Sequence, residues 1–509
     1  MKDFPWLTAI GVVPLVGALA VSLMPASRLR LAKQLAIAFS LVSLALTIGM
    51  ITQFESGAAE QFQLVEQHQW IKAFGIQYKV GVDGLALVLI ALTAFLVPVV
   101  LLASWNVDNK VKSYFALILL LETAMIGVFA ATDVFLFYAL FEVMLVPMYF
   151  LIGVWGGERR VYAAVKFFLY TLLAGLLMLV AVLTMYFLTR DAAGAGTFDY
   201  EQWLTLDVAR NTQRWLFLGF FVAFAVKVPL FPFHTWLPDA HTEAPTGGSV
   251  LLAGVMLKIG TFGFMRYSIP LFPEASRYFA PMMMGLGLFG IFYGALVAIV
   301  QKDIKRLVAY TSIAHLGFII LGTFAFTRQG QSGAVLYMVN HGLSTGALFL
   351  IIGFLYERRH TRLIEEYGGL RSVVPVLAAT FLVAGLSSLA LPGLNGFVSE
   401  FLVLLGTYSR HPVLGIIATF GIILAALYIL VAYQRTMQGP VTVEANRGMA
   451  DLDLREKLVI APVLLVIIVL GVYPAPVLRV IEPSVQRVME RVEKTDPAPT
   501  IESATGEQK

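Results

Sequence analysis

The feature that most constrains this chain is a repeated pattern of long apolar runs. A helix that crosses the hydrocarbon core of a bilayer needs roughly 20 apolar residues, and the sequence supplies about fourteen such runs. With 59% hydrophobic and 13% charged residues, the chain has more apolar surface than a water-soluble core can bury. Because unpaired backbone amides are costly in hydrocarbon, the runs are expected to be helices. We therefore predict an all-α polytopic membrane protein.

The charge pattern between the runs predicts the sidedness of the chain. The expected spans cover approximately residues 5–24, 32–53, 83–105, 113–131, 134–155, 162–189, 214–230, 248–269, 279–300, 305–326, 331–355, 373–408, 412–434 and 457–477. Alternate loops carry most of the basic residues, such as Arg28, Lys110, Arg159 and Arg362. Short basic loops face the cytoplasm, and an even number of spans then places both termini outside.

Two of the runs are expected to be broken helices. Residues 373–408 would form a helix about 54 Å long, which is too long for a bilayer. Pro392 and Gly393 supply a break there, and Pro229 and Pro232 supply one in the earlier run. Each broken run is fourth in a group of five, which is typical of a duplicated transporter core. Because five is odd, the second copy must be inverted in the membrane.

These features divide the chain into five parts. Residues 1–111 hold three helices, residues 112–270 the first five-helix repeat, and residues 271–437 the second, inverted repeat. Residues 438–481 hold a C-terminal span. Residues 482–509 are polar and contain Pro497 and Pro499, so we predict a disordered tail.

Several ionisable residues are expected inside the membrane, where each costs at least about 2.5 kcal/mol. The candidates for proton transfer are Glu142, Lys227, Lys258, His315, His341 and Glu400. Groups of these types change their proton affinity with burial and with nearby charges, so a row of them can pass protons. Glu142 and Lys227 are expected to form a pair that loads or releases a proton.

Each candidate also has a purely structural interpretation. Glu142 and Lys227 could hold helices together as an ion pair, and the two histidines could be ordinary core residues. Glu122 is a further candidate that could instead lie on a helix-packing face. Lys166 lies about one turn from a basic helix end, which favours snorkelling to the surface. Residues 234–243 contain several polar side chains in a helix-breaking loop, and these could either cap helix ends or act as a gate.

Other functional classes lack support in the sequence. The net charge of +4 is small and scattered, which argues against nucleic acid as a partner. The chain has no cysteine, which excludes thiolate-held iron–sulfur clusters within it. We found no dinucleotide fingerprint, Walker A sequence or His-Glu-x-x-His motif, and no spacing typical of a metal site.

Three stretches carry a resemblance to a known family. They are Phe-Glu-Val-Met-Leu-Val-Pro-Met-Tyr-Phe-Leu-Ile-Gly-Val-Trp-Gly at 141–156, Trp-Leu-Pro-Asp-Ala-His-Thr-Glu-Ala-Pro-Thr at 236–246, and Asn-His-Gly-Leu-Ser-Thr-Gly-Ala-Leu-Phe at 340–349. Over nearly its whole length the chain resembles the antiporter-like subunits of bacterial proton-pumping NADH:quinone oxidoreductase, complex I, and among them subunit M. The other members usually have lysine where this chain has Glu400.

The resemblance implies a fourteen-helix inner-membrane subunit with two inverted half-channels, in which the six candidates carry protons. It implies that FMN, iron–sulfur clusters and quinone bind in partner subunits, and that this chain binds neither these cofactors nor a metal. It also implies that the related subunits L and N are neighbours of this chain. An Mrp-type Na⁺/H⁺ antiporter subunit is the alternative with the same fold. A passive structural spacer is a second alternative, but it would have no reason to bury so many charges.

Overall fold

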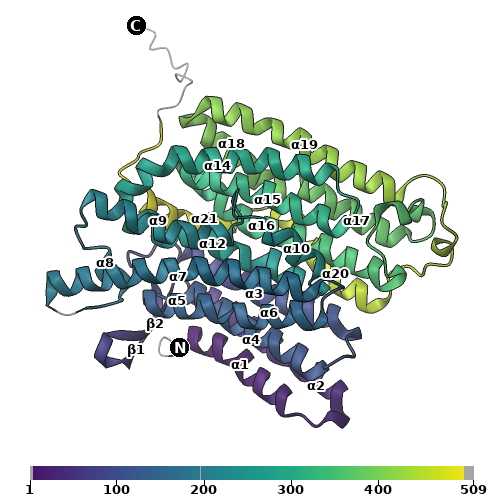
Figure 1. Ribbon diagram of the computed structural model, residues 1–509, viewed down its shortest axis with the longest axis horizontal. Helices are drawn as coiled ribbons and strands as arrows, with labels where there is room; N and C mark the ends of the chain where they lie inside the picture. The colour runs from purple at the N-terminus through teal and green to yellow at the C-terminus, as the bar shows by residue number, and fades with distance from the viewer. Residues whose placement is uncertain (1–3, 195, 498–509) are drawn as a thin grey trace, which may run out of the picture.

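The computed structural model describes residues 4–194 and 196–497 and shows a bundle of helices that run side by side (Figure 1). The helices are α1 Trp6–Leu23, α2 Leu29–Gln53, α3 Gly84–Ala103, α4 Val111–Ala130, α5 Val134–Val143, α6 Leu145–Trp155, α7 Arg160–Ala193, α8 Tyr200–Trp203, α9 Arg210–Lys227, α10 Trp236–Glu243, α11 Thr246–Leu251, α12 Leu257–Gly263, α13 Ile269–Leu271, α14 Pro273–Ile299, α15 Ile304–Phe324, α16 Arg328–Arg359, α17 Pro375–Ser388, α18 Asn395–Arg410, α19 Pro412–Met437, α20 Leu454–Val472 and α21 Ala475–Arg491. The strands are β1 Gln63–Ile71 and β2 Ile76–Val82.

The apolar helices confirm an all-α membrane protein. Among the described residues, 11 helices are long and apolar enough to cross a membrane, or up to 12 if the bent pair of α20 and α21 counts as one span. The expectation of about fourteen counted two broken runs as full spans. The α9 helix begins with polar residues such as Arg210 and Arg214, and α17 has only 14 residues. Length and composition alone therefore give fewer spans.

The centre of the bundle is formed by α16 and the stretch from α11 to α13. The apolar windows of both are buried along their whole length, whereas α2 and α19 turn many side chains outward. The central stretch contains two π-helical segments, η4 Leu252–Met256 and η5 Phe264–Ser268. In η4 the Leu257 amide donates to the Leu252 carbonyl, five residues earlier. Such π-turns inside α-helices are frequent at functional sites.

Both predicted helix breaks are confirmed. The α9 helix ends at Lys227 and α10 begins at Trp236, with Pro229 and Pro232 between them. The α17 helix ends at Ser388 and α18 begins at Asn395, with Pro392 and Gly393 between them. Gly393 has a φ of +93°, which favours glycine.

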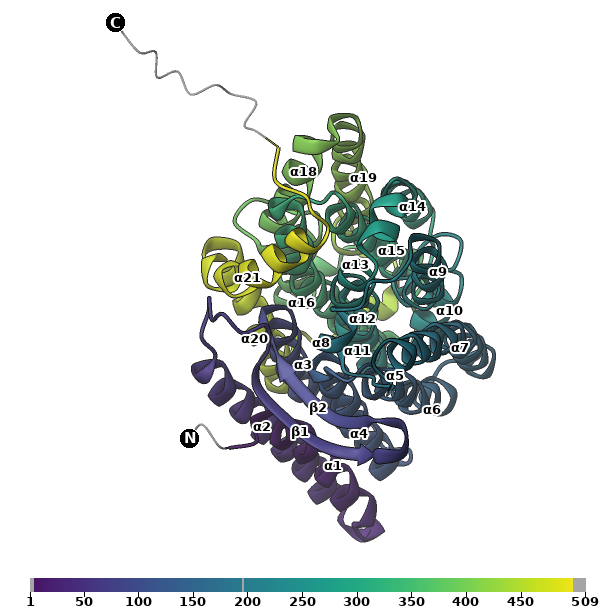
Figure 2. The same ribbon diagram turned by 90° about the vertical axis from the view of Figure 1, so that its left-hand side faces the viewer.

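A β-hairpin and α21 cover one end of the bundle (Figure 2). The strands β1 and β2 pair antiparallel, and β2 adds the bridge Val80–Ala131 to the end of α4. The predicted tail is wrong for residues 482–491, because they complete α21. Ile481, Val485 and Val488 recur at helical spacing and are buried in the core. Residues 498–509 of that tail lie outside the described residues.

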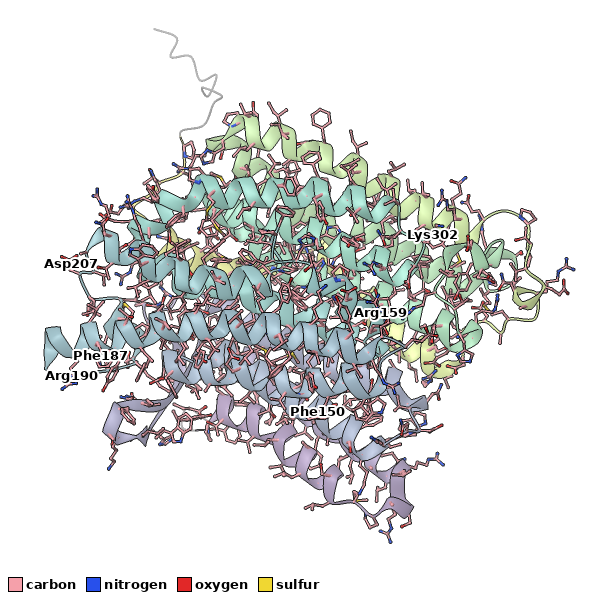
Figure 3. All side chains as sticks on the ribbon, viewed as in Figure 1. Phe150, Arg159, Phe187, Arg190, Asp207 and Lys302 are labelled. Carbon is pink, nitrogen blue, oxygen red and sulfur yellow. The ribbon has the colours of Figure 1, made fainter. Side chains whose placement is uncertain are left out.

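The two ends of the bundle differ in charge. The loops expected to be cytoplasmic meet at one end, which we call the basic end, as Arg159 and Lys302 show in Figure 3. At this end Lys33 pairs with Asp108 and Arg362 pairs with Asp303. Arg190 and Asp207 lie at the opposite end, on the side of the hairpin.

Candidate functional site

A row of buried polar side chains starts at Lys258 in the centre of the bundle. Lys258 lies on α12, directly after the π-helical segment η4, and is fully buried. Its Nζ lies 2.6 Å from Nδ1 of His341 on α16 and also donates to the Ala253 carbonyl of η4. When Lys258 is an ammonium group, which only donates, Nδ1 of His341 accepts and a neutral His341 ring carries its proton on Nε2.

The second step of the row joins His341 to His315 on α15. Their ring centroids are 5.4 Å apart. His315 Nδ1 lies 2.8 Å from the Tyr337 hydroxyl, and His315 Nε2 lies 3.1 Å from the Ser388 hydroxyl at the end of α17. His315 thus contacts two other helices of the second predicted repeat, α16 and α17.

Tyr337 links His315 to Glu400. The Tyr337 hydroxyl donates to Glu400 Oε2 at 2.7 Å. Because a hydroxyl has a single proton, the Tyr337 oxygen must then accept from Nδ1 of His315. Tyr337 and His341 lie four residues apart on α16, which places them one above the other on the same face. Glu400 enters from α18, after the break that follows α17.

The structure therefore brings together four of the six predicted residues. Lys258, His341, His315 and Glu400 come from α12, α16, α15 and α18, and all four are buried. Short contacts join them except between the two histidine rings. A proton can be transferred along each of these contacts, since each connects one donor to one acceptor. The contact that is missing is the one from His341 Nε2, which has no hydrogen-bond partner among the described residues.

Glu142 and Lys227 lie apart from this row. No salt bridge joins them, and among the described residues neither carboxylate oxygen nor Lys227 Nζ has a hydrogen-bond partner. Lys227 Nζ instead lies 4.7 Å from the centre of the Phe141 ring. Glu142 packs on Gly175 of α7, where an added Cβ would meet the Glu142 carboxylate. The proposed pair is thus present as two groups that no salt bridge joins, a buried Lys227 and a half-buried Glu142 whose carboxylate oxygens are inaccessible to solvent.

Glu122 is not joined to the row. It is fully buried on α4, and its carboxylate oxygens have no hydrogen-bond partner among the described residues. The α4 helix packs on α1, α2 and α3, so Glu122 lies among the N-terminal helices.

The helix-breaking loop near α10 holds its own polar contacts. Lys166 pairs with Asp239 at 2.8 Å, a contact that the snorkelling expectation did not include. That expectation considered only neighbours in sequence, whereas Asp239 approaches from another helix. His241 stacks on Phe349 with ring centroids 4.8 Å apart, and neither ring nitrogen has a partner among the described residues. His234 Nε2 lies 3.0 Å from the Tyr293 hydroxyl.

Sequence reasoning missed Tyr337 and Ser388. Neither side chain is charged near neutral pH, so neither stood out in an apolar run. The available signal was the spacing of Tyr337, one helical turn before His341. No group of three or more His, Asp or Glu within residues 4–194 and 196–497 is placed to hold a metal ion.

Comparisons with known proteins place this geometry in context. Residues 131–425 match the family model described as NADH:quinone oxidoreductase/Mrp antiporter, TM, and residues 20–128 match NADH-ubiquinone oxidoreductase chain 4, amino terminus. The chain is 46% identical to NADH-quinone oxidoreductase subunit M of Mycobacterium tuberculosis (strain CDC 1551 / Oshkosh), over 98% of this chain and 97% of that protein.

Solved structures show the same fold. A chain of respiratory complex I from Thermus thermophilus with bound NADH superposes with a TM-score of 0.86 at 34% identity, covering 96% of this chain and 99% of that one. A chain of the Mrp complex from Dietzia sp. DQ12-45-1b has a TM-score of 0.80 at 23% identity, covering 96% of this chain and 52% of that one. The second likeness concerns the fold alone.

Proposed function

Because this chain belongs to the subunit M family of the NADH-quinone oxidoreductases, the antiporter-like, proton-translocating subunits of the membrane arm of complex I, we propose that its protons move along the row from Lys258 to Glu400. One observation carries this proposal. The Tyr337 hydroxyl lies 2.8 Å from His315 and 2.7 Å from Glu400, so it bridges the histidines to the acid.

The bonding pattern defines how a proton would move. When Lys258 gives a proton to Nδ1 of His341, that ring can release its Nε2 proton toward His315. This one step needs a bridging water or a ring rotation, because His341 Nε2 has no hydrogen-bond partner among the described residues. His315 gives its Nδ1 proton to the Tyr337 oxygen as Tyr337 gives its own to Glu400. Each group regains a proton from the preceding one, so none has to hold an extra charge for long. The same contacts serve either direction of travel.

Glu142 and Lys227 are proposed to load the row. The Lys227 ammonium and the carboxylate oxygens of Glu142 are buried and lack protein hydrogen-bond partners among the described residues. A buried charge without a partner is costly, so these two groups favour states in which the proton or an opposite charge is shared. Approach and separation of Glu142 and Lys227 would therefore change which of them holds a proton. Glu122 lies outside this route and is retained only as an additional candidate.

The finer architecture is also a proposal. We propose fourteen spans, in which the broken helices α9/α10 and α17/α18 occupy equivalent places in two inverted five-helix repeats, residues 112–270 and 271–437. The two confirmed breaks support this arrangement. The basic end is proposed to face the cytoplasm of a bacterial inner membrane, with both termini outside.

The chain is a subunit of an NADH:quinone oxidoreductase. We propose that FMN, iron–sulfur clusters and quinone bind in partner subunits, and that the antiporter-like subunits L and N are neighbours in the membrane arm. Redox chemistry in those partner subunits would then drive proton movement between the buried ionisable residues of this chain.

The Mrp-type Na⁺/H⁺ antiporter subunit is the weaker alternative. The high identity over nearly the full length is to subunit M proteins, whereas the likeness to the Mrp chain concerns the fold alone.

The assignment can be tested by tagging the chain and solubilising the membranes gently. NADH:quinone reductase activity should co-purify with the tag, together with many partner subunits. A small set of other membrane proteins without that activity would instead support the antiporter.

A further inference from the structure

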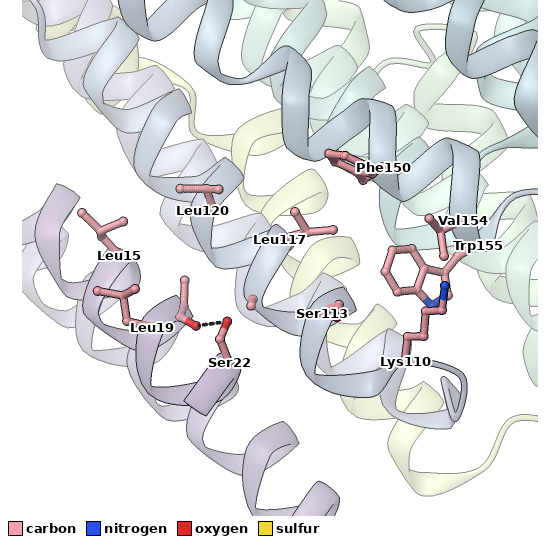
Figure 4. A pocket seen from close by; sticks show the side chains of 12 residues that line it. Leu15, Leu19, Ser22, Lys110, Ser113, Leu117, Leu120, Phe150, Val154 and Trp155 are labelled. Carbon is pink, nitrogen blue, oxygen red and sulfur yellow. Dashed lines mark hydrogen bonds between the residues drawn. The ribbon is translucent and has the colours of Figure 1, made fainter. Parts of the chain in front are cut away.

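A groove on the outside of the bundle has no part in the proton row. It lies between α1, α4 and α6 and has a volume of about 510 Å³ (Figure 4). Its wall is apolar along most of its length, with Leu15, Leu117, Leu120 and Phe150 among the lining residues. Its other end is polar and is formed by Lys110, Ser113, Ser22 and Trp155. The groove is therefore amphipathic along its axis.

The length of the groove matches one leaflet of a bilayer. Lys110 precedes the first turn of α4, and Leu120 lies ten residues further along the chain, which corresponds to about 15 Å along a helix. The hydrocarbon core is about 30 Å thick, so the apolar wall reaches from the basic end to about the midplane.

Lys110 is available to an anion at the mouth. It is exposed, and no carboxylate of the described residues pairs with it. Its neighbours are already engaged, because Asp108 pairs with Lys33 at 3.3 Å and Lys112 donates to the Met24 carbonyl at 2.7 Å. The ammonium group of Lys110 thus lies at the groove without a partner of opposite charge.

Trp155 closes the same end as a fixed wall. Its Nε1 donates to the Asn109 carbonyl at 2.7 Å, and its ring packs edge-on against Tyr114 at 5.2 Å. Figure 4 shows Trp155 and Lys110 beside each other, with Leu15 and Leu120 at the far end. Tryptophan and lysine side chains are typical of the membrane–water interface, where a lipid headgroup lies.

We propose that this groove binds one anionic phospholipid of the leaflet at the basic end, with an acyl chain along α1, α4 and α6 and the phosphate at Lys110. The apolar wall and the single unpaired cation match an amphipathic anion. The site is independent of the proton row.

The test uses the assembled complex in vesicles that contain a trace of phosphatidylglycerol with a photoreactive acyl chain. Labelling of peptides from α1, α4 and α6 is expected to fall about fivefold in Lys110→Ala, and to be retained in Lys110→Arg. Leu117→Trp should fill the groove and also reduce labelling. Lys302→Ala, which removes an exposed cation at the same end, is the matched control and should label as the wild type does.

Phosphatidylcholine with the same photoreactive chain distinguishes a specific site from general contact with lipid. Weaker labelling by phosphatidylcholine, unaffected by Lys110→Ala, is expected. Equal labelling by both lipids, or unchanged phosphatidylglycerol labelling in Lys110→Ala, would overturn the proposal. Absence of label from all three helices would also overturn it, because a protein neighbour would then cover the groove.

Discussion

Lys258 Nζ lies 2.6 Å from Nδ1 of His341, although 83 residues separate the two in sequence. Both side chains are buried, and the ammonium group has one further protein partner, the Ala253 carbonyl. At this distance the pair favours one shared positive charge, because two cations facing each other in a low-dielectric site would repel strongly. Lys258 and His341 therefore suit the first transfer of the proposed row.

The first prediction concerns this pair. Lys258→Met keeps the length and apolar stem of the side chain but removes the proton, so pumping by the assembled complex should fall roughly tenfold or more. Lys302→Ala, at an exposed loop, should pump normally. Proton uptake measured with a pH-sensitive dye in proteoliposomes checks both variants, and wild-type pumping by Lys258→Met would remove Lys258 from the route.

The second prediction concerns Glu142 and Lys227. Glu142→Ala and Lys227→Ala each remove one of the two loading groups, so each should leave the complex assembled while severely reducing proton pumping. Glu158→Ala changes an exposed acid at the end of α6 and serves as the control for Glu142. Assembly is checked by the subunit composition of the purified complex, and normal pumping by both alanine variants would exclude the loading pair.

The third prediction concerns the acid at the end of the row. Glu400→Gln retains a hydrogen-bond acceptor for Tyr337 but cannot gain or lose a proton near neutral pH, so pumping should be impaired. Glu400→Lys should be partly tolerated because it restores a titrating group. Glu365→Gln, at an exposed site, should have no effect. If Glu400→Gln pumped as well as the wild type, Glu400 would not be a proton carrier.

The fourth prediction concerns the pH dependence of the stability of the β1–β2 hairpin, which contacts Asp133. Burial raises the pKa of Asp133 to about 6, although the amides of Leu136 and Gln77 donate to its carboxylate and oppose the shift. A pKa raised in the folded state gives stability that is complete below the unfolded pKa and is lost as pH rises through 6. Ionised Asp133 should therefore loosen the hairpin by roughly 1–2 kcal/mol between pH 5 and 8.

Limited proteolysis of the hairpin in the assembled complex measures this loss. The ratio of wild-type to Asp133→Asn cleavage rates should rise about fivefold to tenfold from pH 5 to pH 8, because asparagine cannot ionise. The ratio cancels the pH dependence of the protease itself. A ratio that stays constant, or falls with pH, would contradict a raised pKa of Asp133 in the folded hairpin.

The sequence predicted those features that depend on local chemistry. Pro392 and Gly393 interrupt an apolar run of excessive length, and the structure breaks the helix between Ser388 and Asn395. Lys258 and Glu400 stood out because charged residues are rare in apolar runs, and both are buried. The long identity to subunit M proteins likewise confirms a family predicted from three short stretches.

The remaining features depend on contacts between distant segments or on weak patterns. In the sequence Tyr337 looks like an ordinary core residue, because its partner Glu400 lies 63 residues away, on α18. The same holds for Lys166, whose partner Asp239 lies 73 residues away. In α21 charged residues separate the apolar residues Ile481, Val485 and Val488, so the composition of this segment predicts a polar tail.

The most direct test of the proton row is Tyr337→Phe. This change removes only the hydroxyl that joins His315 to Glu400 and leaves every charged group in place. Tyr408→Phe, on an exposed face of α18, is the control. In proteoliposomes driven by NADH and quinone, the assembled Tyr337→Phe complex should translocate protons about tenfold more slowly than the wild type. Wild-type translocation by Tyr337→Phe would show that protons do not pass through this bridge.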